Sequence, residues 1–399
     1  MSANRSEVRA LTRRLVSIPS HEDETTAGDA VESWLRSETD ADVTRDRHGN
    51  VVARRGEGPS LALVGHHDVV DPDESQVVDS GGNGAANEDG PEGNDVPDGD
   101  DEDDASDISD ADSGGVAPEY LVEERDGRLY GRGTADMKGS LAAAMLAFRD
   151  ADPAGELVFA SFVGEEQGGV GARAAIDDGF APDYAVVGEG STNYAGDDQT
   201  DVVVAHRGRR GSTLTAHGTA AHASEPEAGE NAVYRACDAV DVVRDLDAPA
   251  ATVLGERVAG SLVVTEIDGG TAWNVVPERC TVTIDERTVP GERAPLERVE
   301  AVDGVAWTVD QDLPPMACDD ERFAEAALDA ADASQPATPE LVTKPHATDA
   351  GWLAAAGTTC VVCGAAEPGE AHTAGESVSV DVLERCYEIY RTLATRFRP

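Results

Sequence analysis

Asp136 is the most informative of the histidines and acidic residues along this chain whose types and positions could serve chemistry. It lies in the glycine-rich stretch 131–139, directly before a run of small residues that predicts a helix. Glycine permits positive φ angles and a close approach of the backbone, and both oxygens of a carboxylate in such a turn can point in one direction. Asp136 could therefore bridge two cations if the chain supplies further ligands.

Four apolar runs that predict strands, 61–65, 156–164, 184–188 and 359–364, each lead to a candidate ligand. The candidates, in chain order, are His66 and Asp68, the pair Glu165 and Glu166, Glu189, and His372. Ligands collect at the carboxyl ends of strands in open α/β sheets, so we expect these side chains to meet. Taken singly, each has an ordinary interpretation as a hydrogen-bonded histidine or a solvated loop carboxylate. Together they match the nitrogen and oxygen ligands of zinc.

The motifs around these residues resemble the co-catalytic zinc amidohydrolases, the family of acetylornithine deacetylase, succinyl-diaminopimelate desuccinylase, aminoacylase and glutamate carboxypeptidase. The resemblance covers nearly the whole chain, and its motifs are GHHDVV (65–70), GRGTADMKG (131–139), GEE (164–166), GE (188–189) and AHTAGE (371–376). It implies two metal ions. One would be held by His66 and Glu189, and the other by Glu166 and His372. Asp136 would bridge them.

The same resemblance implies that Asp68 orients His66 and that Glu165 is the general base. Water shared by two Zn²⁺ about 3.5–4 Å apart has a lowered pKa, and Glu165 would pass its proton to the leaving amine. Adjacent residues of an extended segment point in opposite directions, so Glu165 and Glu166 need an irregular backbone to face one site. The alternative is that Glu166 alone faces the metals and Glu165 is solvated. Co²⁺ or Mn²⁺ could replace Zn²⁺, because affinity order alone does not decide the metal.

Composition and charge limit the partners and the cellular setting that we expect for this protein. The chain has 399 residues, 40% of them hydrophobic, and a formal net charge of −48 from 79 acidic and 31 basic residues. Such charge makes nucleic acid an unexpected partner and destabilises a compact state at low salt. We therefore expect the cytoplasm of a salt-accumulating halophile, where molar salt screens charges within about 3 Å. The absence of an export signal or an apolar run of membrane length predicts no membrane partner.

The order of elements predicts an α/β fold, with a mixed-sheet catalytic domain in two parts, 1–200 and 313–399. Between them, 201–312 predicts an α+β domain whose antiparallel sheet carries two helices on one face, in a ferredoxin-like arrangement. Residues 71–119 contain no Lys or Arg and many acidic residues, so we expect a disordered insertion there. A long flexible loop costs little closure entropy, so it need not disturb a site on either side.

The inserted domain resembles the lid or dimerisation domain of the family, which implies a homodimer. By this resemblance His222 reaches into a partner's site to stabilise the oxyanion, and Asn274 and Arg287 bind substrate. An arginine suits a substrate carboxylate because its fork binds both oxygens. The alternative for Arg287 is a surface ion pair.

The resulting hypothesis is a metal-dependent hydrolase that cleaves the amide bond of an N-acyl amino acid, or of a short peptide, with a free carboxylate. Four alternatives remain open. The same metals could serve an aminopeptidase or dipeptidase, or the chain could be a binding protein that has lost catalysis. It could also release an amino acid from an acidic carrier protein, or act mainly as an interaction protein through its acidic insertion.

Overall fold

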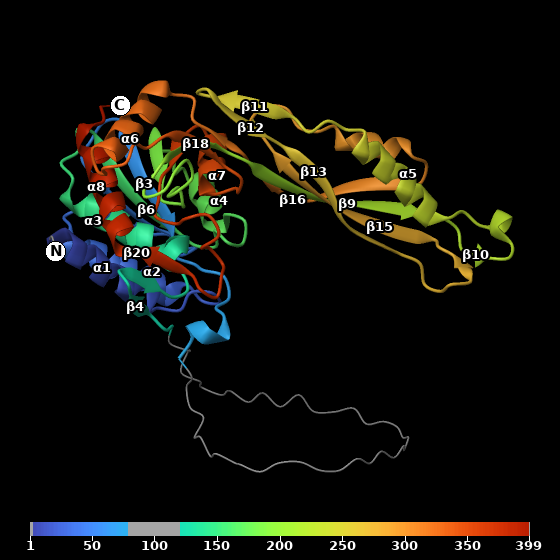
Figure 1. The fold of residues 1–399 in the computed structure, drawn as a ribbon, viewed down its shortest axis with the longest axis horizontal. Coiled ribbons are helices and arrows are strands. Elements are labelled where there is room, and N and C mark those ends of the chain that lie inside the picture. Colours follow the sequence, from blue (N-terminus) through green and yellow to red (C-terminus); the bar gives the residue numbers. More distant parts are fainter. Residues whose placement is uncertain (1–2, 79–119, 399) are drawn as a thin grey trace, which may run out of the picture.

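The computed structural model describes residues 3–78 and 120–398, which form two domains (Figure 1). Most of the predicted insertion, 79–119, lies outside the described residues. Its first part is built into the fold, so the expectation of disorder from residue 71 is wrong for 71–78. There Asp73 caps the short 3₁₀-helix η1 (Glu74–Gln76), the buried Gln76 donates to the carbonyl of Thr373 at 3.0 Å, and Val77 pairs with Tyr120.

The first domain is built on a mixed sheet of nine strands in the order β1-β2-β6-β3-β7-β19-β8-β17, with β18 beside β8. Its members are β1 (Asp42–Arg45), β2 (Val51–Arg55), β3 (Ser60–His66), β6 (Glu156–Phe162), β7 (Tyr184–Val187), β8 (Val202–His206), β17 (Met316–Ala317), β18 (Leu341–Lys344) and β19 (Thr359–Val362). The central strands β6, β3, β7 and β19 run parallel to one another. Their carboxyl ends therefore lie along the same edge.

Helices cover both faces of this sheet, which explains why β3 is buried along its whole length. Leu61 and Leu63 pack on one face, and Ala62 and Val64 on the other. The first face is covered by α1 (Ala3–Val16), α2 (Thr25–Glu38), α3 (Gly139–Asp150), α6 (Glu321–Asp332) and α8 (Val380–Arg396). The second is covered by α4 (Val170–Asp177) and α7 (Asp349–Ala355). The small strands β4 (Glu123–Arg125), β5 (Arg128–Tyr130) and β20 (Ser377–Ser379) form a separate sheet.

The second domain is a four-stranded antiparallel sheet in the order β13-β15-β9-β16. Its strands are β9 (Gly208–His217), β13 (Ser261–Gly269), β15 (Arg279–Thr288) and β16 (Val305–Leu313), and it carries α5 (Ala232–Arg244) and the 3₁₀-helix η4 (Leu296–Ala301). Inward residues of β9 and β15 pack with both helices in one apolar cluster. Chain order and pairing give a ferredoxin-like β-α-β-β-α-β unit, so the predicted fold class is confirmed.

The junction between the domains differs from the prediction at residue 201. Strand β8 pairs with β17, β18 and β19 of the large sheet, so the second domain begins at Gly208. The hairpin of β11 (Ala250–Val253) and β12 (Glu256–Ala259) also packs toward the first domain, where Val258 joins Ala205 and Val289 in an apolar cluster. At the other end of the second domain, β10 (Ala221–His222) pairs with β14 (Val275–Val276) (Figure 1). Among the described helices, none combines the length and apolar character needed to cross a bilayer.

Candidate metal centre

Five of the predicted ligands meet at the edge of the large sheet where its parallel strands end. His66 is the last residue of β3, and Glu166 follows β6. Glu189 follows β7, and His372 lies in the loop between β19 and β20. Asp136 comes from the turn before α3, within the irregular helix η2 (Thr134–Lys138). Topology alone therefore gathers residues that are more than three hundred positions apart.

Each oxygen of Asp136 faces a different histidine. Its Oδ1 lies 3.2 Å from Nε2 of His66, and its Oδ2 lies 3.1 Å from Nε2 of His372. The first histidine is also 3.3 Å from Oε1 of Glu189, and the second is 3.0 Å from Oε1 of Glu166. The result is two groups of three side chains that share one carboxylate.

These groups fit two cations of the zinc type. Four ligands placed about 2.0–2.1 Å from Zn²⁺ in a tetrahedron are about 3.3 Å apart, close to the separations of 3.0–3.3 Å measured between the donor atoms. Each group offers one imidazole nitrogen and carboxylate oxygens, a donor set typical of catalytic zinc. His372 has a φ of +63°, which is uncommon outside glycine and directs its ring toward the cluster at the cost of local strain.

Asp68 and Glu376 support the cluster from behind. Nδ1 of His66 donates to the carbonyl of Asp68 at 3.0 Å and lies 3.2 Å from its carboxylate, which leaves Nε2 free to bind a metal. The other carboxylate oxygen of Asp68 accepts the backbone N–H of Glu166 at 3.0 Å. One side chain thus fixes a ligand of each group. Burial opposes ionisation of Asp68, but His66 and the backbone N–H groups of Glu165 and Glu166 lower its pKa.

Glu376 holds the turn that carries Asp136, a role that the sequence interpretation missed. Its Oε1 accepts the backbone N–H groups of Ala135 at 2.9 Å and Asp136 at 3.1 Å, and its Oε2 accepts from Arg132 at 2.7 Å. Both charged side chains of this pair are buried, with 0% and 4% exposure. The sequence did contain a signal for this pair, because Arg132 and Glu376 lie inside the motifs 131–139 and 371–376. Lys344 was also missed; its Nζ lies 3.5 Å from Oε2 of Glu189.

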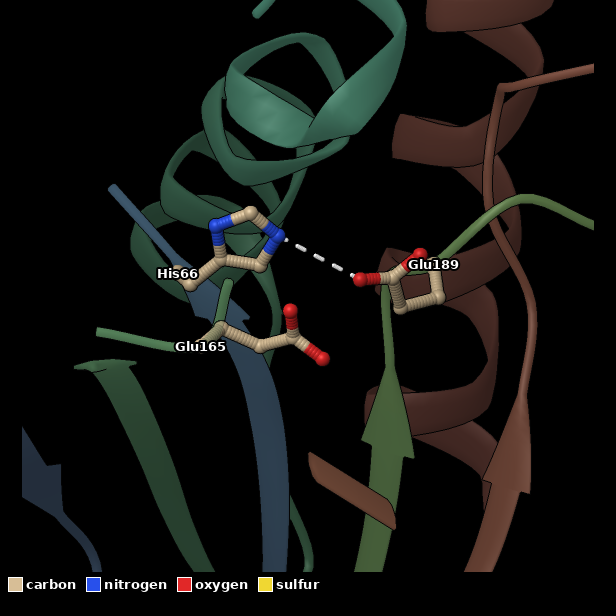
Figure 2. A group of neighbouring side chains, drawn as sticks. All are labelled: His66, Glu165 and Glu189. Atoms are coloured by element: carbon tan, nitrogen blue, oxygen red, sulfur yellow. Dashed lines mark ion pairs between the residues drawn. The ribbon is translucent and has the colours of Figure 1, made fainter. Parts of the chain in front are cut away.

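Glu165 and Glu166 both face the cluster. Oxygens of Glu165 lie within 4.8 Å of donor atoms of His66 and Glu189, and Figure 2 shows its carboxylate directed into the space between them. The bend that this requires is made by Gly164, whose φ is +59°. Burial raises the pKa of Glu165 well above its usual range, and the carboxylates of Asp349, Glu189 and Glu166 add to this effect. Two bound cations would act in the opposite direction and favour the ionised base.

The predicted residues of the second domain lie at its two ends. His222 is exposed on β10, and Asn274 precedes the paired strand β14; the carbonyl of Asn274 accepts the N–H of Ala223 at 2.9 Å. The structure thus brings His222 and Asn274 together, at the end of the domain remote from the large sheet (Figure 1). Arg287 is near the other end, where its Nε donates to Asp285 at 2.7 Å. This contact is the ion pair considered as the alternative for Arg287.

Comparisons with known proteins show the family of this chain. Residues 104–396 match the family described as Peptidase family M20/M25/M40. Succinyl-diaminopimelate desuccinylase from Acidiphilium cryptum (strain JF-5) is 30% identical over 382 residues, covering 87% of this chain and 86% of that protein. Acetylornithine deacetylase from Myxococcus xanthus is 29% identical over 297 residues, covering 69% of this chain and 74% of that protein. Aminopeptidase PepT from Bacillus cereus ATCC 10987 has a similar fold, with a TM-score of 0.71 at 19% identity and 98% coverage of both chains.

The family match spans most of the chain and contains every residue of the cluster except His66. The desuccinylase similarity extends over most of both proteins. The resemblance inferred from the motifs is therefore confirmed. This chain belongs to Peptidase family M20/M25/M40 and is a metal-dependent hydrolase of amide bonds.

Proposed function

We propose that this enzyme hydrolyses the amide bond of an N-acyl amino acid, in the manner of a deacetylase or desuccinylase, at a centre of two Zn²⁺. The observation that carries the proposal is Asp136, whose two oxygens face two histidines at 3.2 and 3.1 Å. A bridging carboxylate of this kind is suited to a pair of cations. The similarity to a desuccinylase over 87% of this chain supports the substrate class.

Each residue of the centre would have a separate role in this reaction. His66 and Glu189 would hold one ion, Glu166 and His372 the other, and Asp136 both. When bound, the two cations would polarise the scissile carbonyl and lower the pKa of the attacking water. Glu165 would take a proton from this water and deliver it to the leaving nitrogen as the C–N bond breaks. Asp68 keeps Nε2 of His66 directed at the cluster throughout.

Arg287 would bind the carboxylate of the substrate. Asp285 accepts hydrogen bonds from both Arg287 and Arg209, each at 2.7 Å from the guanidinium Nε. Two guanidinium groups thus share one carboxylate, which leaves one positive charge uncompensated within this trio. A fork-shaped donor with excess positive charge is suited to a free carboxylate.

We also infer a homodimer in which His222 and Asn274 serve the partner's metal centre. Both residues lie on the end of the second domain that is remote from their own cluster (Figure 1). Strand β13 is an edge of its sheet and exposes Val263 and Ile267 by 50% and 52%. A groove of about 800 Å³ runs between β13 and α5. An apolar sheet edge beside a groove favours pairing with a second copy of the chain.

The experiment that tests the substrate class is release of free amine from acetyl-, succinyl- and glutamyl-capped amino acids and from simple dipeptides. It should be run in molar KCl with added Zn²⁺, on the wild type, on Glu165→Ala and on the exposed control Glu57→Gln. We expect turnover of one capped series that is abolished in Glu165→Ala and unchanged in the control. Turnover confined to dipeptides with a free amine would instead make the enzyme a dipeptidase.

A further inference from the structure

Asp349 has a buried carboxylate for which the surrounding described protein groups provide no hydrogen bond. It is the first residue of α7 and is only 2% exposed. Within the described part of the chain, neither carboxylate oxygen has a hydrogen-bond partner. The capping of α7 is provided by the preceding residue, because the hydroxyl of Thr348 accepts the N–H of Ala350 at 3.2 Å. Burying an unpaired carboxylate is costly, so a group of this kind requires a proton or a partner.

The pocket that Asp349 lines also contains Glu165. It has a volume of about 20 Å³, and its lining residues are Glu165, Gly168, Gly169, Leu313, Ala347, Thr348, Asp349 and Trp352. None of these residues carries a cationic side chain. A pocket needs roughly 10–15 Å³ to hold one water molecule, and such a water requires polar partners. The pocket therefore has the size and lining to join the two carboxyl groups through one water.

A glycine keeps this space open. A Cβ atom at Gly169 would lie 2.8 Å from Oδ1 of Asp349 and 2.5 Å from Nε1 of Trp352, and the φ of +73° also favours glycine there. Gly169 belongs to the loop between β6 and α4 that carries Glu165. The loop that carries the base and the start of α7 thus meet closely at Asp349.

We propose that Asp349 is a positioning residue for Glu165. Its protonated carboxyl group donates a hydrogen bond to one water molecule in their shared pocket, and this water donates a hydrogen bond to the Glu165 carboxylate. This inference rests on the proposed role of Glu165 as general base. Engaging one oxygen of Glu165 in this way fixes the side chain and directs the other oxygen toward the attacking water. A base held in position contributes more than one that samples several rotamers.

Burial favours this proton. It raises the pKa of Asp349 to about 8; His66 opposes the shift, and the carboxylates of Asp68 and Glu189 add to it. His206 contacts the neighbouring Thr348 at 3.2 Å, and burial lowers its pKa to about 4, so it brings no positive charge at neutral pH. Two carboxyl groups in one small space cannot both ionise readily.

The test compares Asp349→Asn, which keeps an N–H donor, with Asp349→Leu, which removes it while keeping the same branching and the same number of side-chain heavy atoms. We expect Asp349→Asn to retain kcat within about threefold, and Asp349→Leu to lose roughly 10–100-fold in kcat with little change in KM. Thermal stability and zinc content should be maintained in both, because no described group of the protein pairs directly with the Asp349 carboxylate. Equal kcat in the wild type and Asp349→Leu would overturn the proposal, as would a loss in both variants together with stability or zinc.

Two further measurements separate this proposal from the proposed function. Infrared spectra at neutral pH should contain a carbonyl band of a protonated carboxylic acid that is missing from Asp349→Asn, and its absence from the wild type would refute the proton on Asp349. In a Glu165→Gln background, Asp349→Leu should have no additional effect on kcat. If Glu165→Gln alone leaves kcat unchanged, the general-base assignment fails. If Glu165→Gln lowers kcat but Asp349→Leu lowers it further in that background, Asp349 does not act through Glu165.

Discussion

At the scale of single residues, the centre depends on side chains that would bind neither metal nor substrate. Glu376 satisfies two backbone N–H groups of the turn around Asp136 and forms a buried ion pair with Arg132. Glu376→Ala would leave the Arg132 guanidinium buried without its carboxylate. We expect a loss of about 3–5 kcal/mol in the free energy of unfolding and roughly 10–100-fold weaker zinc binding.

The matched control for this variant is Glu367→Ala. Glu367 pairs with Arg128 at 2.8 Å, but the two side chains are 26% and 24% exposed. Because partly exposed pairs contribute little, this variant should lose about 1 kcal/mol or less. Chemical unfolding and a zinc titration measure both quantities. Equal losses in the two variants would show that the buried pair has no special role at the turn.

His206 gives the fold a specific sensitivity to acid. Burial lowers its pKa to about 4, against a usual value of 6.5. Protonation therefore favours the unfolded state as the pH falls below 6.5, and this part of the stability is lost progressively between pH 6.5 and 4. At pH 5 the cost is about 2 kcal/mol. Between pH 7 and pH 5, the free energy of unfolding should therefore fall by about 2 kcal/mol less in His206→Gln than in the wild type. An exposed histidine variant, His48→Gln, should follow the wild type.

At the scale of elements, strand order explains why so much of the centre could be predicted. His66, Glu166 and Glu189 each follow an apolar run, and parallel strands place such positions at one edge whatever their separation in sequence. The assignment of β8 to the second domain failed because an apolar strand does not reveal in its own sequence which sheet it will join. Asp349 was not identified either, since its importance depends on a pocket shared with a residue nearly two hundred positions away.

From the position of His222 in the second domain, we expect active sites that are shared between the subunits of a dimer. If His222 serves the partner's centre, Glu165→Ala and His222→Ala should each be nearly inactive alone. When the two are dissociated and reassembled together, each mixed dimer contains one complete site. Activity should then recover to about one quarter of the wild type, as expected for random pairing of two subunits.

The edge strand provides the control for this experiment. Ile267→Asp places a charge on the exposed face of β13 and should shift the protein from dimer to monomer in light scattering. Its activity should fall with the dimer fraction. If the mixed variants recover no activity although they form mixed dimers, His222 does not act across the interface.

At the scale of the whole molecule, charge governs the conditions in which the fold is stable. A net charge of −48 on 399 residues produces strong self-repulsion, which salt screens as the Debye length falls from about 10 Å at 0.1 M to about 3 Å at 1 M. We expect the midpoint of thermal unfolding to rise by about 10 °C or more between 0.1 and 2 M KCl, equivalent to several kcal/mol. Most of the rise should occur below about 1 M. An unchanged midpoint would contradict the expectation that this chain is adapted to molar salt.

The most direct test of the central claim is the number of metal ions needed for activity. Metal-free protein should be titrated with Zn²⁺ in molar KCl, with metal content and amide hydrolysis followed together in the wild type and in Asp136→Asn. We expect two Zn²⁺ per chain, loss of activity on their removal, and at least tenfold weaker binding when the carboxylate facing both histidines is replaced. Full activity after both ions have been removed would contradict the proposed two-metal centre.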